Sequence, residues 1–126
     1  MNVMDSSCWI EYFHSTPISN EFSLVVERPR ELLVPSIVLY EVCKNLLSKT
    51  HRANVENFVE AMQKGRVIVL TSELSIIAAD ISRKYKLPMA DSIIYATTKQ
   101  YNAVLWTTDQ HFDGLPNVRY FDKTQH

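Results

Sequence analysis

The chain has 126 residues, with 13 Lys and Arg against 14 Asp and Glu, and its formal net charge is −1. This length and a hydrophobic fraction of 46% are typical of one globular domain, so we expect a single domain over residues 1–126. The longest apolar runs are far shorter than the ~18 residues that span a bilayer, and the N-terminus lacks a basic and then apolar leader. We therefore expect a cytoplasmic protein with no membrane segment.

Only two glycines occur, Gly65 and Gly114, and this excludes several classes of enzyme. A Walker loop, a dinucleotide-binding turn and a G-x-S-x-G elbow each need several glycines for close backbone approach or positive φ. The two cysteines, Cys8 and Cys43, supply neither a disulfide framework nor a structural zinc site. The near-zero net charge also gives no overall electrostatic signal for nucleic-acid binding.

Short apolar runs alternate with stretches of helical periodicity along the chain. In chain order, we predict strands at residues 3–4 and 31–34, helices at 39–46 and 55–62, a strand at 67–70, helices at 74–85 and 90–97, and strands at 103–106 and 118–121. The strands are apolar on both faces, which is typical of a parallel sheet covered by helices on each side. The sequence therefore predicts an α/β fold.

Four acidic residues lie where such a fold places its ligand site, which is beyond the carboxyl ends of the strands. Asp5 and Asp109 each follow a predicted strand, Asp91 opens the helix after Pro88, and Glu41 lies one turn into the helix that follows Pro35. Four carboxylates in one pocket repel one another by about 4 kcal/mol for each close pair at an effective dielectric of about 20. A bound divalent cation is the obvious compensation for this repulsion.

Oxygen ligands without His or Cys favour a hard cation, so we expect Mg²⁺, with Mn²⁺ able to substitute. Such ions serve phosphodiester hydrolysis. Each acid also has an ordinary structural role open to it: a helix N-cap for Asp5, a first-turn position for Asp91, a turn for Asp109 and a solvated helix face for Glu41. Spacing alone leaves both interpretations open.

Four segments resemble the motifs of the PIN-domain family. They are VMDSSCWIEYF, PSIVLYEVCKNLL, LPMADSIIYATTKQY and LWTTDQHFDGLPNV, in the family's order and covering essentially the whole chain. The likeness is closest to the VapC-type toxins. It implies a three-layer α/β/α sandwich with a central parallel sheet, and a Mg²⁺-dependent endoribonuclease toxin that a cognate antitoxin neutralises. It also implies a homodimer.

The resemblance assigns roles to particular acids. Asp5 matches the acid that ends the first strand, Glu41 the helical glutamate and Asp91 the acid of the AD motif, while Asp109 matches the fourth acid. These four are the implied catalytic residues and metal ligands, with a metal-activated water as nucleophile and products that carry 5′-phosphate and 3′-hydroxyl ends. Asp113 lies four residues after Asp109 and is a further candidate ligand.

Three more residues are predicted to contact the RNA substrate. Ser6 and Thr107 match hydroxyl positions beside the site, and Lys44 follows Glu41 by three residues on the same helix face. None of the four histidines, His111 among them, is needed in this mechanism.

Two other functions compete with this prediction. A phosphoacceptor signalling domain also binds Mg²⁺ at strand-end acids, but it needs paired acids after the first strand, where this chain has Asp5 followed by Ser6 and Ser7. It also needs a Lys directly after the last strand, where Asp122 precedes Lys123. A PIN-like scaffold that binds RNA or protein without cutting has no need of four intact acids.

Overall fold

A sheet of parallel strands forms the centre of the protein in a computed structural model that describes residues 1–125. His126, one of the four histidines that the predicted mechanism does not need, lies outside the described residues. The strands are β1 (Asn2–Met4), β2 (Leu32–Pro35), β3 (Arg66–Ile68), β4 (Val104–Thr107) and β5 (Val118–Tyr120). Their order in the sheet is β3-β2-β1-β4-β5, and every pairing is parallel. The predicted α/β fold with a parallel sheet is confirmed.

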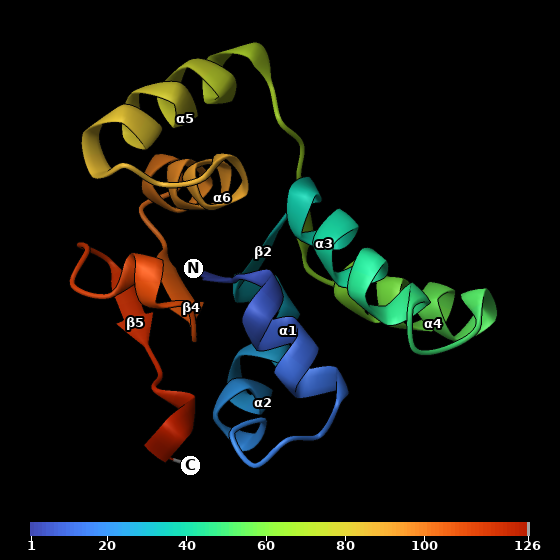
Figure 1. Cartoon of the computed structure of the whole chain (residues 1–126). Helices are drawn as coiled ribbons and strands as arrows, with labels where there is room; N and C mark the ends of the chain where they lie inside the picture. Colours follow the sequence, from blue (N-terminus) through green and yellow to red (C-terminus); the bar gives the residue numbers. More distant parts are fainter. Residues whose placement is uncertain (126) are drawn as a thin grey trace.

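Helices cover both faces of this sheet. They are α1 (Ser6–Phe13), α2 (Asn20–Val26), α3 (Ser36–Leu47), α4 (Arg52–Met62), α5 (Ser72–Tyr85) and α6 (Met89–Gln100), with short 3₁₀ turns at η1 (Pro29–Glu31), η2 (Gln110–Phe112) and η3 (Lys123–Gln125). Figure 1 shows α5 and α6 on one side of the sheet and α1 and α2 on the other, while α3 and α4 form a pair that projects from the side of the molecule. This arrangement is the predicted three-layer sandwich. Within residues 1–125, no helix has the length and apolar character needed to cross a membrane.

Some strands begin or end at other residues than predicted, because hydrogen bonding, and not apolar content, determines where a strand ends. The predicted strand at 67–70 ends early, because β3 pairs with β2 only through Ile68, and the apolar Val69 and Leu70 are exposed. The predicted strand at 31–34 begins one residue late, because η1 occupies Glu31. The helices α1 and α2 are not among the predicted ones, since eight and seven residues form only about two turns and repeat an apolar spacing too few times to be recognised.

The order of the strands reverses between β1 and β4. From β1 the chain adds β2 and β3 on one side, and it then returns to the other side of β1 with β4 and β5. In open parallel sheets, ligands bind at this switch point, beyond the carboxyl ends of the strands. Asp5 follows β1 and Asp109 lies two residues after β4, so the topology brings acids from opposite ends of the chain to one place.

Aromatic contacts and buried hydroxyls hold the helices in position. The buried Trp9 of α1 stacks on Phe13 with ring centroids 5.5 Å apart, and Phe13 in turn contacts Phe58 of α4 at 4.6 Å. Residues 92–98 of α6 are all buried, and the hydroxyls of Thr97 and Thr98 donate to carbonyl oxygens one turn earlier in that helix. Because these polar groups are satisfied, α6 can lie against the sheet and fix the position of its first turn.

Gly65, in the turn before β3, lies where only a hydrogen atom fits. An added Cβ would lie 2.9 Å from the backbone oxygen of Leu32 and 3.1 Å from Cγ2 of Val34. We expect Gly65→Ala to lower the free energy of unfolding by about 1–3 kcal/mol, as overpacking does, measured by urea denaturation. The control is Gly114→Ala, which has φ of +85° but no atom within 4 Å of the new Cβ, and we expect it to cost about 1–2 kcal/mol from backbone strain alone. Unchanged stability of Gly65→Ala would contradict this packing.

Candidate metal centre

Asp5 lies at the junction of β1 and α1, where it is the N-cap of the helix. Its Oδ1 accepts hydrogen bonds from the Ser7 hydroxyl (2.5 Å) and from the backbone N–H of Cys8 (3.1 Å). Its Oδ2 accepts from the Thr107 hydroxyl at 2.5 Å. The side chain is therefore held on both oxygens, and the residue is only 3% exposed. Asp5 has the structural role of an N-cap and also lies at the site.

Thr107, the last residue of β4, connects two of the acids. Its hydroxyl donates to Asp5 and accepts from the backbone N–H of Asp109 at 2.9 Å. We predicted that Thr107 contacts substrate; the structure places the residue fully buried, with its hydroxyl bonded to both of these acids. Thr107 instead positions Asp5 relative to Asp109.

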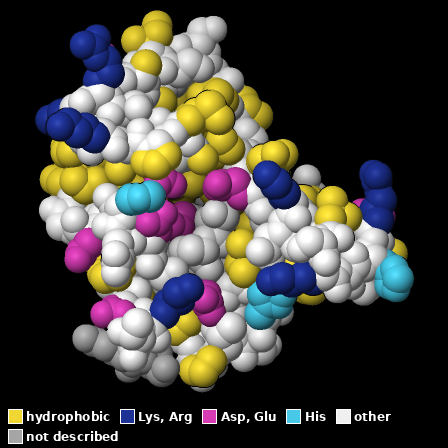
Figure 2. Space-filling model, viewed as in Figure 1, with side chains coloured by type: hydrophobic (Ala, Val, Ile, Leu, Met, Phe, Trp, Pro, Cys, Tyr) yellow, Lys and Arg dark blue, Asp and Glu magenta, His cyan; other side chains and the backbone are white. Residues whose placement is uncertain are grey.

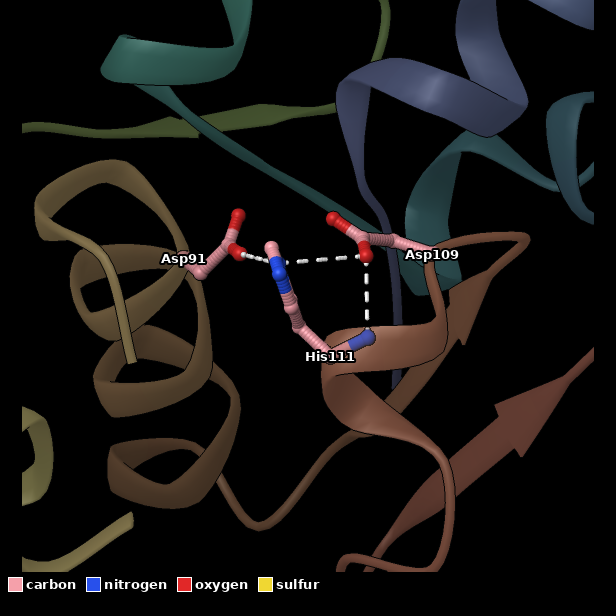
Figure 3. Close-up of side chains that lie close together, drawn as sticks. All are labelled: Asp91, Asp109 and His111. Atoms are coloured by element: carbon pink, nitrogen blue, oxygen red, sulfur yellow. Dashed lines mark hydrogen bonds and ion pairs between the residues drawn. The ribbon is translucent and has the colours of Figure 1, made fainter. Parts of the chain in front are cut away.

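Asp91, Asp109 and His111 form a close cluster (Figure 3). Asp91 comes from the first turn of α6, and Asp109 caps η2, accepting from the backbone N–H of His111 at 2.9 Å. Nδ1 of His111 lies 2.9 Å from Oδ2 of Asp91 and 3.3 Å from Oδ1 of Asp109. One potential ligand atom from each residue lies within 4.8 Å of the other two. The side chains thus point toward one common position.

Glu41 of α3 adds a fourth carboxylate. Its Oε1 is buried and has no hydrogen-bond partner in the described part of the chain. Burial raises the pKa of Glu41, the Ser6 side chain lowers it, and the negative charges of Asp91 and Asp109 raise it further. These interactions place Glu41 in the electrostatic range of the cluster. A buried carboxylate oxygen without a partner is a group that a cation would satisfy.

The pKa values of Asp5 and Asp91 are raised mainly by burial. Burial raises the pKa of Asp5 to about 6, against the lowering effect of its hydrogen bonds from Ser7 and Thr107. Burial also raises the pKa of Asp91, which His111 lowers and Asp109 raises. Each carboxylate is thus destabilised as an anion, and oxygen donors in this state fit a divalent cation. Figure 2 shows acidic and His side chains gathered near the middle of one face, with Lys or Arg side chains on the surrounding surface.

The other predicted residues lie at different distances from this centre. Ser6 begins α1 and interacts with Glu41, whereas Lys44 is exposed one turn further along α3. Asp113 is exposed at the end of η2 and does not belong to the cluster found among residues 1–125. The roles of Ser6 and Lys44 toward RNA stay predictions.

His111 is the residue that the sequence reasoning missed. It is exposed, yet its imidazole contacts two of the acids, so an all-oxygen ligand set is not what the structure presents. A signal for it exists in the sequence, because Asp109 two residues earlier is a strong capping residue. In the turn that Asp109 caps, His111 lies two residues after the acid, and its side chain contacts Asp91 and Asp109. The acid-x-His spacing was therefore the signal in the sequence.

We expect His111→Ala to raise the pKa of Asp91. The hydrogen bond from His111 favours the ionised carboxylate, and its removal leaves burial and the charge of Asp109, which both favour the neutral acid. A carboxyl ¹³C NMR titration of the metal-free protein measures this directly. His51→Ala, an exposed histidine at the start of α4, is the matched control and should leave Asp91 unchanged. A lower pKa of Asp91 in His111→Ala would refute the assigned contact.

A parallel sheet with acids from four separate elements at its switch point defines an α/β protein with an acidic site of the kind that holds divalent cations. The chain belongs to the PIN domain family, whose model matches residues 3–117. The family membership predicted from the four motifs is thereby confirmed. No curated protein matches the chain by sequence.

Solved structures of toxin-antitoxin proteins share the fold. A toxin-antitoxin complex from Klebsiella pneumoniae aligns with a TM-score of 0.82 and 19% identity, covering 94% of this chain and 96% of that chain. VapBC2 from Rickettsia felis, bound to a DNA fragment from its promoter, aligns with a TM-score of 0.75 and 15% identity over 96% and 98%. VapC20 of Mycobacterium tuberculosis, a toxin that cleaves the sarcin-ricin loop, gives 0.75 and 16% over 94% and 99%. At these identities the likeness shows a shared fold.

Proposed function

We propose that this protein is a metal-dependent endoribonuclease toxin that acts in the cytoplasm and is neutralised by a cognate antitoxin. The observation that carries the proposal is the convergence of Asp5, Glu41, Asp91 and Asp109, from four different elements, on the switch point of a PIN fold. VapC20, with the same fold, cleaves an RNA. RNA phosphodiesters are therefore the substrate that we propose for this site.

The residues present fit a divalent cation, for which we propose Mg²⁺ with Mn²⁺ as a substitute. Asp91 and Asp109 offer accessible oxygens, and Glu41 offers the buried Oε1 that lacks a partner. When bound, the ion supplies a polarised water for attack on phosphorus and stabilises the negative charge that develops on the phosphate. The products would carry 5′-phosphate and 3′-hydroxyl ends.

The chain's own residues then orient the reactants. Ser7 and Thr107 hold both oxygens of Asp5 in place, so this carboxylate needs little reorganisation. The unpartnered Oε1 of Glu41 is buried at the same site, and a bound cation would relieve the cost of its negative charge. Lys44 and Ser6 flank this side of the site and remain our candidates for contact with RNA.

The test is cleavage of total cellular RNA by the purified protein. We expect discrete fragments with Mg²⁺ or Mn²⁺ and none after chelation with EDTA, and end-labelling should show 5′-phosphates. Sequencing of the fragment ends would identify the target. Cleavage that survives EDTA would overturn the proposed metal dependence, and intact RNA under all metal conditions would overturn the nuclease.

A homodimer is the assembly that we propose. An apolar groove of about 280 Å³ between α5 and α6 is lined in part by the exposed Met89, and Ile76 is a further exposed apolar residue on α5. Apolar surface of this kind is typical of contacts between subunits. Sedimentation velocity of the wild-type protein and of Ile76→Asp tests this assembly, and a wild-type monomer at all concentrations would exclude it.

The two alternatives have less support. A phosphoacceptor must expose its aspartate, whereas Asp5 is 3% exposed and bonded on both oxygens. A scaffold without catalysis does not account for four acids kept close at an electrostatic cost. Stabilisation by Mn²⁺ or Mg²⁺ in a thermal unfolding assay separates the metal site from a metal-free scaffold.

A further inference from the structure

A pocket of about 350 Å³ adjoins the metal centre and shares Asp109 and His111 with it, whereas its other lining residues have no role in the function described so far. One wall is the segment that follows β4, including Asp109 and Gln110. The other wall is formed by Tyr120 at the end of β5 and by Asp122, Lys123 and Thr124 beyond it. Because Asp109 belongs both to this pocket and to the metal centre, whatever fills the pocket lies next to the reacting phosphate.

The C-terminal wall is held in place by contacts of its own. Oδ1 of Asp122 accepts from the backbone N–H and the hydroxyl of Thr124, at 2.9 and 2.7 Å. Nζ of Lys123 lies 3.3 Å from Oε1 of Glu11, which ties this segment to α1 across the molecule. The pocket is therefore a formed part of the fold with positioned acceptors and donors.

The side chains that line the pocket fit the base and the ribose of an RNA strand better than its phosphate. Asp109 and Asp122 repel a phosphate, but their oxygens accept hydrogen bonds from ribose hydroxyls or base amino groups. The exposed side chains of Gln110 and Lys123 supply donors for base edges, and the half-buried ring of Tyr120 offers a surface for stacking. A pocket of this size and mixed polarity suits a nucleoside.

We propose that this pocket binds the base and ribose of the nucleotide adjacent to the scissile phosphate, and that it recognises the 2′-hydroxyl. The proposal rests on the proposed function and adds a specificity site to it. The site is formed by Gln110, Tyr120, Asp122, Lys123 and Thr124. It explains why the site would prefer RNA to DNA, since the 2′-hydroxyl can both donate and accept hydrogen bonds and is absent from DNA.

The direct test is an NMR titration of the ¹⁵N-labelled protein with ribonucleosides and their 2′-deoxy counterparts, in EDTA. We expect saturable shifts at the backbone amides of Gln110, Tyr120 and Thr124, with weaker binding of the deoxy forms. Shifts confined to other surfaces, or equal affinity for both sugars, would overturn the proposal. Because no metal or cleavage is needed, this result is independent of whether the protein proves to be a nuclease.

Variants then connect the pocket to RNA recognition. We expect Tyr120→Ala to raise KM for RNA by about 10-fold or more, since base stacking on an aromatic ring commonly has an effect of this size, with a smaller change in kcat. Tyr120→Phe should keep near-wild-type KM. The exposed Gln110→Ala, which removes a donor without touching the core, should also raise KM.

The matched control is Lys64→Ala, an exposed residue in the turn before β3, at the opposite end of the strands. It should leave KM unchanged. If Gln110→Ala and Tyr120→Ala both behave like Lys64→Ala while RNA is cut normally, the pocket has no part in recognition and the nuclease assignment stands.

Discussion

Replacing Asp91 by Asn is expected to reduce RNA cleavage by about 100-fold or more, because changes even to outer contacts of metal sites commonly lose 10–100-fold. Asn retains the shape of the side chain but removes the charge that faces Asp109 and His111. The variant should fold, since removal of one anion relieves part of the repulsion in the metal-free protein. Initial rates on a fluorescent RNA and circular dichroism measure the two effects.

Asp80→Asn is the matched control for this substitution. Asp80 is exposed on α5, the helix packed against α6, and the exchange removes the same charge outside the site. Its cleavage rate should equal that of the wild-type protein. A second measurement, the gain in thermal stability on adding Mn²⁺, should shrink in Asp91→Asn and persist in Asp80→Asn. Full cleavage by Asp91→Asn would remove this residue from the proposed mechanism.

The second large effect concerns stability and pH in the absence of metal. Burial raises the pKa of Asp5 from its ordinary value of 3.8 to about 6. Between these two values the folded protein binds more protons than the unfolded chain, so the stability contributed by Asp5 is full below pH 3.8 and is lost as the pH rises through 6. This loss amounts to about 3 kcal/mol. The raised pKa values of Glu41, Asp91 and His111 act in the same direction.

Urea denaturation of the EDTA-treated protein from pH 4 to pH 7.5 measures this dependence. We expect Asp5→Asn to flatten the curve, because Asn stays neutral and can still accept from Ser7 and from the backbone N–H of Cys8. Excess Mg²⁺ or Mn²⁺ should stabilise the wild-type protein increasingly as the pH rises, since ligands must be deprotonated to bind. Wild-type stability that rises through this interval without metal would contradict the buried position of Asp5.

The fold was largely predictable because its signals are local. Proline at the start of α3 and α6, helical spacing of apolar residues and short apolar strands all agree with the α/β sandwich. The predicted strand at 67–70 was too long because Val69 and Leu70 have strand-like composition, but the pairing with β2 ends at Ile68. Pairing partners are a property of the sheet, which a single segment does not contain.

The candidate site was predictable in its acids and less so in their surroundings. Strand ends and helix starts locate Asp5, Glu41, Asp91 and Asp109, because the topology of a parallel sheet determines where those positions meet. The burial of Thr107 could not be predicted from its own segment, because it depends on the packing of β1 against β4. His111 was missed because its contact with Asp91 joins elements that only the tertiary fold brings together.

The pairing of β1 with β4 has a consequence for when the site can exist. Met4 lies opposite Trp106, so the first strand closes against a strand that is synthesised near the end of the chain. Asp5, Glu41 and Asp91 are all made before that partner appears, and the Thr107 hydroxyl that orients Asp5 is made last among these contacts. Closing so long a loop also costs more conformational entropy than pairing strands that are neighbours in the sequence. A partly synthesised or truncated chain therefore lacks the assembled centre, and any cutting of RNA would begin only with the complete domain.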